Sequence, residues 1–120
     1  MKESERTYRL LIENANDIIW NFDLSSMRFT FLSFAVERIL DYSLEEASRL
    51  TLEDMHPPVT LQRTRAAFRK LIAGENPKDR MVMEQEIYRA TGKVVWMEMN
   101  VKLLRDEQGL AYSTSGSTRD

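Results

Sequence analysis

Apolar and polar residues alternate over their longest run between Gly92 and Gly109. A period of two is typical of a β-strand with one buried and one accessible face. One register contains Val95, Met97, Met99, Val101 and Leu103, and the other contains Trp96, Glu98, Asn100 and Lys102. The run predicts a long strand whose inner face packs on a core. Its outer face is polar and carries a single tryptophan.

The same alternation recurs in four shorter segments. They cover residues 17–23, 28–33, 80–89 and 110–118. We expect Trp20 and Phe22 to point inward from the first segment, and Phe29 and Phe31 to share one face of the second. A turn at residues 90–93 joins the segment at 80–89 to the long strand as an antiparallel hairpin, and a second turn at 105–109 leads into the last strand.

Helical periodicity appears at the N-terminus and in the middle of the chain. It predicts helices at residues 4–16, 34–40, 44–50, 51–55 and 60–73. Tyr8, Leu11 and Ile12 form the apolar stripe of the first helix. Ser33 is expected to cap the second, and Ser43 to cap the third through a capping box with Glu46.

The longest of these helices should pack against the sheet and end at Gly74. Its expected inward residues are Leu61, Thr64, Phe68, Leu71 and Ile72. The element order is a helix, two strands, a run of helices and three strands. This order predicts an α+β fold with one five-stranded antiparallel sheet, several short helices and one longer helix on one side, and an N-terminal amphipathic helix.

Length and composition restrict the classes of protein that fit. The 120 residues suffice for one domain, which we divide into a flanking helix at 1–16 and a core at 17–120. The net charge of −2 gives no basic footprint for nucleic acid, and no apolar run approaches the length of a membrane span. The absence of cysteine excludes thiolate catalysis and disulfides, and a reduced cytoplasm fits it.

Five sequence motifs, taken in order, resemble those of the PAS domain across about residues 8–120. They are YRLLIENANDIIWNFDL, VERILDYSLEEA, MHPPV, ATGKVVWMEMNVKLLRDEQG and the final STRD. The resemblance implies a sensory or regulatory domain of a bacterial signalling protein, with a sensor histidine kinase or a diguanylate cyclase as the parent. It also implies an effector domain in the same chain and a signal that leaves past Asp120, so the chain is expected to be a fragment of a longer one.

Catalytic chemistry has little support in this segment. General acid–base or nucleophilic catalysis needs a titratable group beside a partner, and the chain has one histidine and no cysteine. We therefore expect no enzyme activity and no metal site, with His56 serving a structural role in its turn. No cofactor is required. A covalent flavin adduct is excluded because it needs a cysteine, and a flavin or haem redox sensor is the weakest alternative.

Strand phase, matched to the family, points one set of side chains toward a candidate pocket. The candidate ligand-binding residues are Trp20, Phe22, Phe31, Met83, Gln85, Ile87, Met97, Met99, Thr114 and Thr118. A core of aromatic and methionine side chains is the plain alternative. Gln85, the two threonines and the Trp20 N–H need polar partners in an apolar interior, which one another, water or a small-molecule ligand would supply.

The outer face suggests an interaction surface. Trp96 is expected to meet either the N-terminal helix, through Tyr8, Leu11 and Ile12, or a second copy in a homodimer. Two functions therefore stay open: a ligand-sensing domain, and a ligand-free module for dimerisation. No nucleic acid partner and no membrane contact are expected for this segment.

Overall fold

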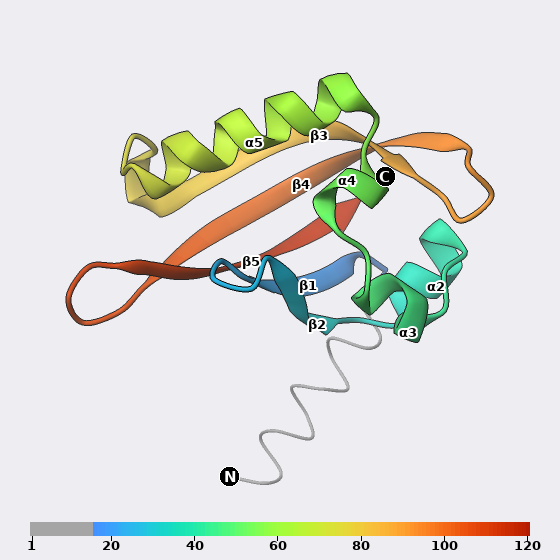
Figure 1. The fold of residues 1–120 in the computed structure, drawn as a ribbon, viewed down its shortest axis with the longest axis horizontal. Coiled ribbons are helices and arrows are strands. Elements are labelled where there is room, and N and C mark those ends of the chain that lie inside the picture. The colour runs from blue at the N-terminus through green and yellow to red at the C-terminus, as the bar shows by residue number, and fades with distance from the viewer. Residues whose placement is uncertain (1–15) are drawn as a thin grey trace, which may run out of the picture.

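Five antiparallel strands form a single sheet in the order β2-β1-β5-β4-β3 (Figure 1). The structure, a computed structural model, describes residues 16–120, so the predicted helix at 4–16 lies outside the described residues. The elements are β1 Ile18–Asp23, β2 Arg28–Leu32, α2 Ala35–Leu40, α3 Leu44–Ser48, α4 Leu52–Met55, α5 Pro58–Ile72, the 3-10 helix η1 Pro77–Asp79, β3 Arg80–Tyr88, β4 Val94–Arg105 and β5 Ala111–Arg119.

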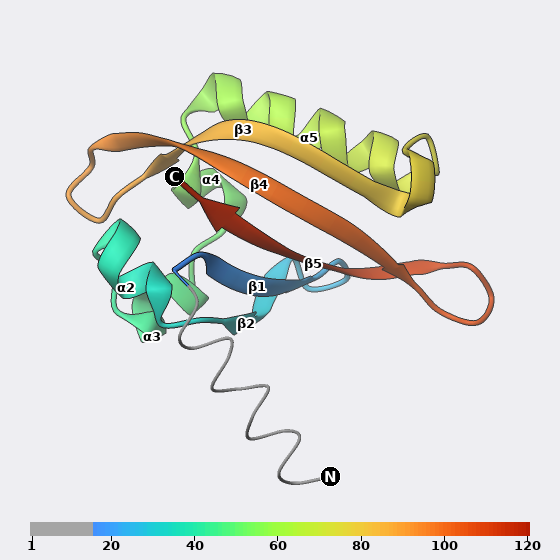
Figure 2. The ribbon, with the colours of Figure 1, turned by 180° about the vertical axis from the view of Figure 1, so that it is seen from behind.

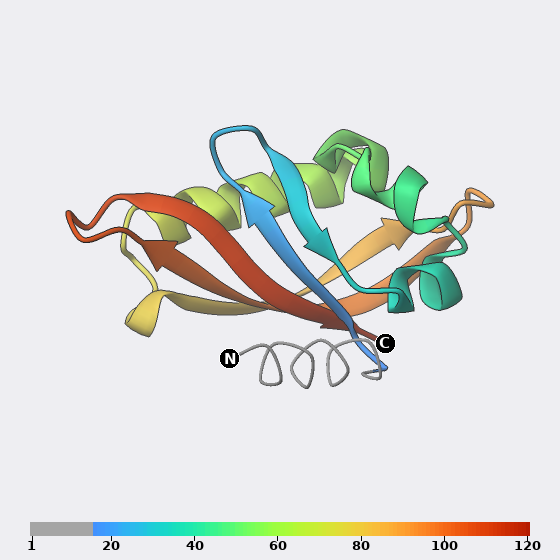
Figure 3. The ribbon, with the colours of Figure 1, turned by 90° about the horizontal axis from the view of Figure 1, so that it is seen from below.

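The helices α2–α5 lie on one side of the sheet (Figure 3). Helix α5 runs along β3, and α2 and α3 lie near β1 and β2 at the other end of the sheet (Figure 1). Helix α4 lies between these two groups and contacts α5 and β3. Seen from behind, β3 and β4 pass in front of α5, with no described helix in front of them (Figure 2). The predicted α+β architecture is confirmed, and the core lies between the helices and the inner face of the sheet.

Strand β4 has the two faces that its alternation predicts. Met97, Met99, Val101 and Leu103 are buried, whereas Trp96 on the other face is 55% exposed. Met99 pairs with Met83 of β3 and with Thr118 of β5, which places β4 in the interior of the sheet. The inner register predicted for β3 is also present, since Met81, Gln85 and Ile87 are buried.

Local capping signals fix the short helices with one exception. Ser43 and Glu46 form the predicted capping box of α3, and Thr51 and Asp54 form a second one at α4. The predicted cap of α2 is wrong: the N-cap is Phe34 and makes no side-chain cap bond. Ser33 is buried and its hydroxyl accepts a hydrogen bond from the backbone N–H of Ile19, so it ties α2 to β1 instead.

Helix α5 begins at Pro58, two residues before the predicted start. Proline is favoured in the first turn of a helix because the N–H that it lacks has no intrahelical acceptor there. The helix ends as predicted before Gly74, whose φ of +83° is a conformation that glycine adopts without strain. Ile72 was expected to face inward and does not. It is 41% exposed, because it is the last helical residue and lies about 100° around the axis from the buried Leu71.

A β-bulge in β2 corrects the expected placement of Phe31. Asn21 pairs with Phe31 and Phe22 pairs with Phe29, so Thr30 is an extra residue between the two pairs. Directly paired residues of antiparallel strands share a face. Phe29 therefore joins Phe22 on the inner face, while Phe31 joins the exposed Asn21 on the outer face.

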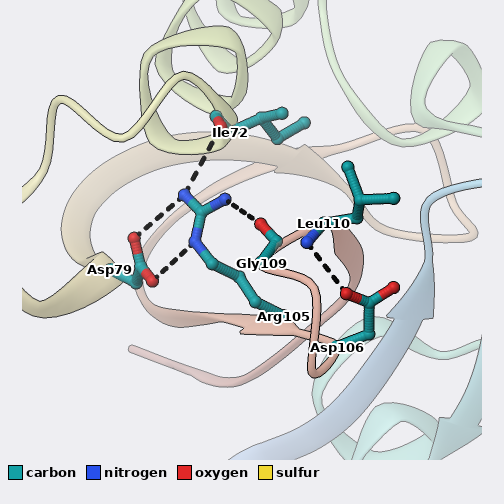
Figure 4. A network of polar contacts seen from close by, with 6 residues as sticks. All are labelled: Ile72, Asp79, Arg105, Asp106, Gly109 and Leu110. Atoms are coloured by element: carbon teal, nitrogen blue, oxygen red, sulfur yellow. Dashed lines mark hydrogen bonds and ion pairs between the residues drawn. The ribbon is translucent and has the colours of Figure 1, made fainter.

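Arg105 connects the β4–β5 turn to the end of α5 and to η1 (Figure 4). Its guanidinium donates to both carboxylate oxygens of Asp79, at 2.9 and 3.2 Å. It also donates to the backbone oxygens of Gly109, at 3.1 Å, and Ile72, at 3.4 Å. The hydrogen bond from Arg105 holds the pKa of Asp79 below its usual value.

We expect Asp79→Asn to lower stability near neutral pH and to do so progressively less in acid. A carboxylate with a depressed folded-state pKa contributes stability above the pKa of the unfolded chain, and loses it as pH falls through the folded pKa. The difference in urea midpoint between wild type and Asp79→Asn should therefore be largest above about pH 5 and should shrink below about pH 4. Asparagine tolerates the positive φ of this position, so the variant isolates the charge. A difference that stays constant between pH 7 and pH 2 would contradict this role.

Candidate functional site

A cavity of about 70 Å³ lies between the sheet and the helices. Its wall contains side chains from all five strands and from the helices α2 to α5. The lining is largely apolar. Its polar side chains are Trp20, His56, Thr64, Gln85 and Thr118.

The structure brings six of the ten predicted pocket residues to this cavity. They are Trp20, Phe22, Gln85, Ile87, Met99 and Thr118. Met97 and Thr114 are buried in the core but do not line it. Met83 lies beside α5, near Arg63 and Lys70, and Phe31 lies on the outer face.

Trp20 forms a polar contact at the end of the cavity nearest the last strand. Its indole Nε1–H donates to the Thr118 hydroxyl at 3.0 Å, and both side chains are buried. The ring lies over Gly116, which pairs with Trp20 in the neighbouring strand. A glycine here lets the indole approach the β5 backbone, so Gly116 fixes the position of Trp20.

Gln85 forms the second polar contact of the lining. The Thr64 hydroxyl of α5 donates to Gln85 Oε1 at 3.1 Å, and the Gln85 amide approaches the Met99 sulfur at 3.2 Å. The predicted inner register of Gln85 is thus confirmed. Its partners come from the protein itself, as they do for Trp20 and Thr118.

Thr114 differs from the other buried polar residues of the inner face. It is fully buried, and its hydroxyl has no hydrogen-bond partner within residues 16–120. A buried hydroxyl that loses its water contacts without gaining a partner lowers stability. The hydroxyl of Thr114 therefore lowers the free energy of unfolding.

We expect Thr114→Val to leave the free energy of unfolding unchanged or to raise it by up to about 1 kcal/mol. Valine keeps the shape of threonine and removes only the unpaired hydroxyl. The matched control is Thr118→Val on the same strand, which should lower stability by about 1–3 kcal/mol because the buried Trp20 N–H loses its acceptor. Urea denaturation measures both values. A Thr114→Val variant as unstable as Thr118→Val would show that the Thr114 hydroxyl has a partner.

His56 lines the cavity from the turn between α4 and α5. Its Nδ1 lies 2.8 Å from the Glu86 carbonyl oxygen, which can only accept, so Nδ1 carries the proton. Burial lowers the pKa of His56, partly offset by this hydrogen bond, and keeps the ring neutral at pH 7. Within residues 16–120, no group of three or more His, Cys, Asp or Glu side chains is arranged to hold a metal ion.

Sequence reasoning missed the helical part of the wall. Val36, Leu40, Ala47, Leu50, Leu52 and Met55 line the cavity from α2, α3, α4 and the segment between them. Their apolar periodicity was a usable signal, because short helices beside a sheet must bury their apolar stripe against it.

The two predicted interaction residues that the structure describes, Trp96 and Asp120, do not line the cavity. Trp96 is exposed on the outer face of the sheet beside the exposed Val94, and Val82, which pairs with Asn100 farther along the same face, is also exposed. Asp120 is exposed, and the preceding Arg119 forms an ion pair with Glu98 at 3.1 Å. Tyr8, Leu11 and Ile12 lie outside the described residues.

Comparison with known protein families decides the identity of the fold. The model described as PAS fold matches residues 29–118. The chain belongs to the PAS family. The match covers the helices α2 to α5 and the strands β3 to β5 up to residue 118, and so includes most of the cavity wall; β1, which contributes Ile18, Trp20 and Phe22, lies before it.

Solved structures agree with this assignment at the level of the fold. A PAS domain from Colwellia psychrerythraea has a TM-score of 0.76 and 20% identity, covering 100% of this chain and 97% of that one. The N-terminal domain of a diguanylate cyclase with PAS/PAC sensor from Marinobacter aquaeolei has a TM-score of 0.72 and 17% identity, covering 87% and 94%. A domain of a sensory box sensor histidine kinase/response regulator from Geobacter sulfurreducens has a TM-score of 0.74 and 20% identity, covering 98% and 94%.

No curated protein matches the chain. Among residues 16–120, no helix has the length and apolar character needed to span a membrane.

Proposed function

We propose that this PAS domain is a regulatory domain of a bacterial signalling protein, and that a small molecule in the inner cavity controls its state. The observation that carries the proposal is the cavity itself, which touches all five strands as well as α2 to α5. A ligand at this position contacts nearly every element of the fold. Its binding energy can therefore favour one arrangement of helices and sheet over another.

The last strand offers a route from the cavity to the outer face. Thr118 lines the cavity and accepts the Trp20 hydrogen bond, and the next residue, Arg119, pairs with Glu98. A change in the Trp20–Thr118 contact would move the backbone that leads to Asp120. In this proposal an effector domain in the same chain reads that movement, in a cytoplasmic histidine kinase or diguanylate cyclase.

The second candidate is a ligand-free module that mediates dimerisation. It is supported by Trp96, Val82 and Val94, which leave apolar surface exposed on the outer face of the sheet. Exposed apolar patches of this kind mark interaction sites. A flavin or haem sensor is less well supported, since 70 Å³ is far below the roughly 300–1,000 Å³ of pockets that hold larger ligands.

The two candidates are separated by a search for a retained or added ligand. Native mass spectrometry of the purified chain detects a retained molecule, and an absorbance spectrum detects a chromophore. A thermal-shift screen of metabolites on wild type and Gln85→Leu then tests the cavity, with Trp96→Ala as the matched outer-face control. Compounds that stabilise wild type and Trp96→Ala, but act differently on Gln85→Leu, support a sensor. If nothing binds, and Trp96→Ala converts a dimer to a monomer in analytical ultracentrifugation, the ligand-free module is correct.

A further inference from the structure

The polar side chains of the cavity wall are all engaged with other protein atoms. Trp20 bonds to Thr118, Thr64 to Gln85, Gln85 to Met99, and His56 to the Glu86 carbonyl. The unused capacity that these bonds leave is small, chiefly the Nε2 lone pair of His56 and the hydroxyl proton of Thr118, so a ligand that needs several hydrogen bonds would have to break one of these pairs. The buried group left behind would then offset the bond gained.

Among residues 16–120, no Asp, Glu, Lys or Arg side chain lines the cavity. Its one titratable residue, His56, is neutral at pH 7 because burial lowers its pKa. Each of the ion pairs within residues 16–120 joins side chains that are at least partly exposed, and none of their members lines the cavity. An ionic ligand would lose its hydration and find no counter-charge, which is strongly unfavourable.

The size of the cavity restricts the ligand further. Its 70 Å³ is about half the volume of an engineered apolar cavity of roughly 150 Å³ that stays dry and binds benzene or xenon. Two methionines, Met55 and Met99, line the wall. Methionine side chains are flexible and polarizable, so they adapt to the shape of a small apolar guest.

We propose that the cavity selects small, uncharged, apolar molecules and rejects anions, cations and polyhydroxylated metabolites. This inference rests on the proposed sensory function and specifies the chemical class of its ligand. The hydrogen bonds of the wall join β1 to β5 and α5 to β3 and so keep its polar groups paired with one another. Dispersion contacts and the removal of apolar surface from water supply the affinity.

The chain carries its own pair of reporters for this test. It has two tryptophans: the Trp20 indole lines the cavity, and the Trp96 indole is exposed on the opposite face of the sheet. In a ¹H–¹⁵N spectrum of the 120-residue chain, their two indole N–H signals report separately on the two faces. Xenon and benzene are the apolar probes, and acetate and ethylammonium are charged probes of similar size.

We expect xenon and benzene to shift the Trp20 signal saturably and to leave the Trp96 signal in place. Acetate and ethylammonium should move neither signal in a saturable way. Ala47→Leu, which adds volume at a fully buried position of the wall, should weaken xenon binding by about tenfold or more. Leu52→Phe, which adds volume at a partly buried position of the wall, should also weaken xenon binding and replaces Ala47→Leu if that variant does not fold. Val82→Ala, at an exposed position on the outer face, is the matched control and should keep xenon binding within about threefold.

The outcomes separate this inference from the proposed function. Saturable binding of acetate or ethylammonium at Trp20, without xenon binding, overturns the apolar class and leaves a ligand-sensing cavity. Apolar binding at Trp20 that leaves the backbone amides of Ser117 and Arg119 unchanged supports the apolar class but overturns signal transfer through β5. A Trp20 signal that no probe shifts overturns both.

Discussion

Gly116→Ala is expected to destabilise the domain by about 3 kcal/mol or more. A Cβ at this position would overlap the backbone oxygen of Asn100 and would lie 2.7 Å from Cζ2 of the Trp20 indole. The first contact is with the backbone of β4, which the sheet holds in place on both sides. The second is with a buried ring, so neither neighbour can move without disturbing the core.

Urea denaturation followed by tryptophan fluorescence measures this effect. Ser117→Ala, the next residue on the same strand, is the matched control and should change stability by less than about 0.5 kcal/mol. Gly92→Ala provides a second comparison, because its φ is +91° but its surroundings are open. It should cost about 1 kcal/mol from the backbone alone. A Gly116→Ala variant no less stable than Gly92→Ala would show that the indole does not lie against β5.

Leu71→Ala is expected to lower the free energy of unfolding by about 2–5 kcal/mol. Leu71 is 0% exposed and lies near the end of α5, where the helix packs on the core. Truncation removes its buried methyl groups and leaves a cavity, because the surrounding side chains relax only in part. The loss should appear as a lower urea midpoint with an unchanged slope.

The neighbouring Ile72→Ala is the matched control. Ile72 is 41% exposed, and the contact that it makes to Arg105 uses its backbone oxygen, which alanine retains. The expected loss is about 0.5 kcal/mol. Equal losses for the two variants would mean that α5 is rotated about its axis relative to the structure described above.

Period-two alternation predicted the sheet well, because a strand between a core and solvent must place apolar residues on alternate positions. It located β3, β4 and β5 to within about two residues, including the inward Gln85 and the outward Trp96. The same reasoning failed at Phe31. A bulge adds a residue without changing the hydrophobic pattern, so alternation alone cannot reveal the shift in register.

The cavity was harder to predict than the sheet. Strand phase indicated that Met97 and Thr114 face inward, and both are buried. Whether an inward residue meets a void or another side chain depends on the packing of α2 to α5 across the sheet, which one-dimensional periodicity does not contain. The partners of Gln85 and Thr118 depend on the same packing, since Thr64 and Trp20 lie 21 and 98 positions away.

The irregularities at the two outermost strands also affect how copies of the domain can meet. Unpaired strand edges are templates for intermolecular pairing, and native proteins blunt them with bulges, charged side chains or covering segments. The extra residue Thr30 interrupts the regular edge of β2, and the His56 ring occupies the Glu86 carbonyl at the edge of β3. Edge-to-edge growth into ordered aggregates is therefore disfavoured at both ends of the sheet. His56 therefore has two positions of consequence: its ring lines the cavity, and it occupies a backbone acceptor at the edge of β3 that a second copy could otherwise pair with.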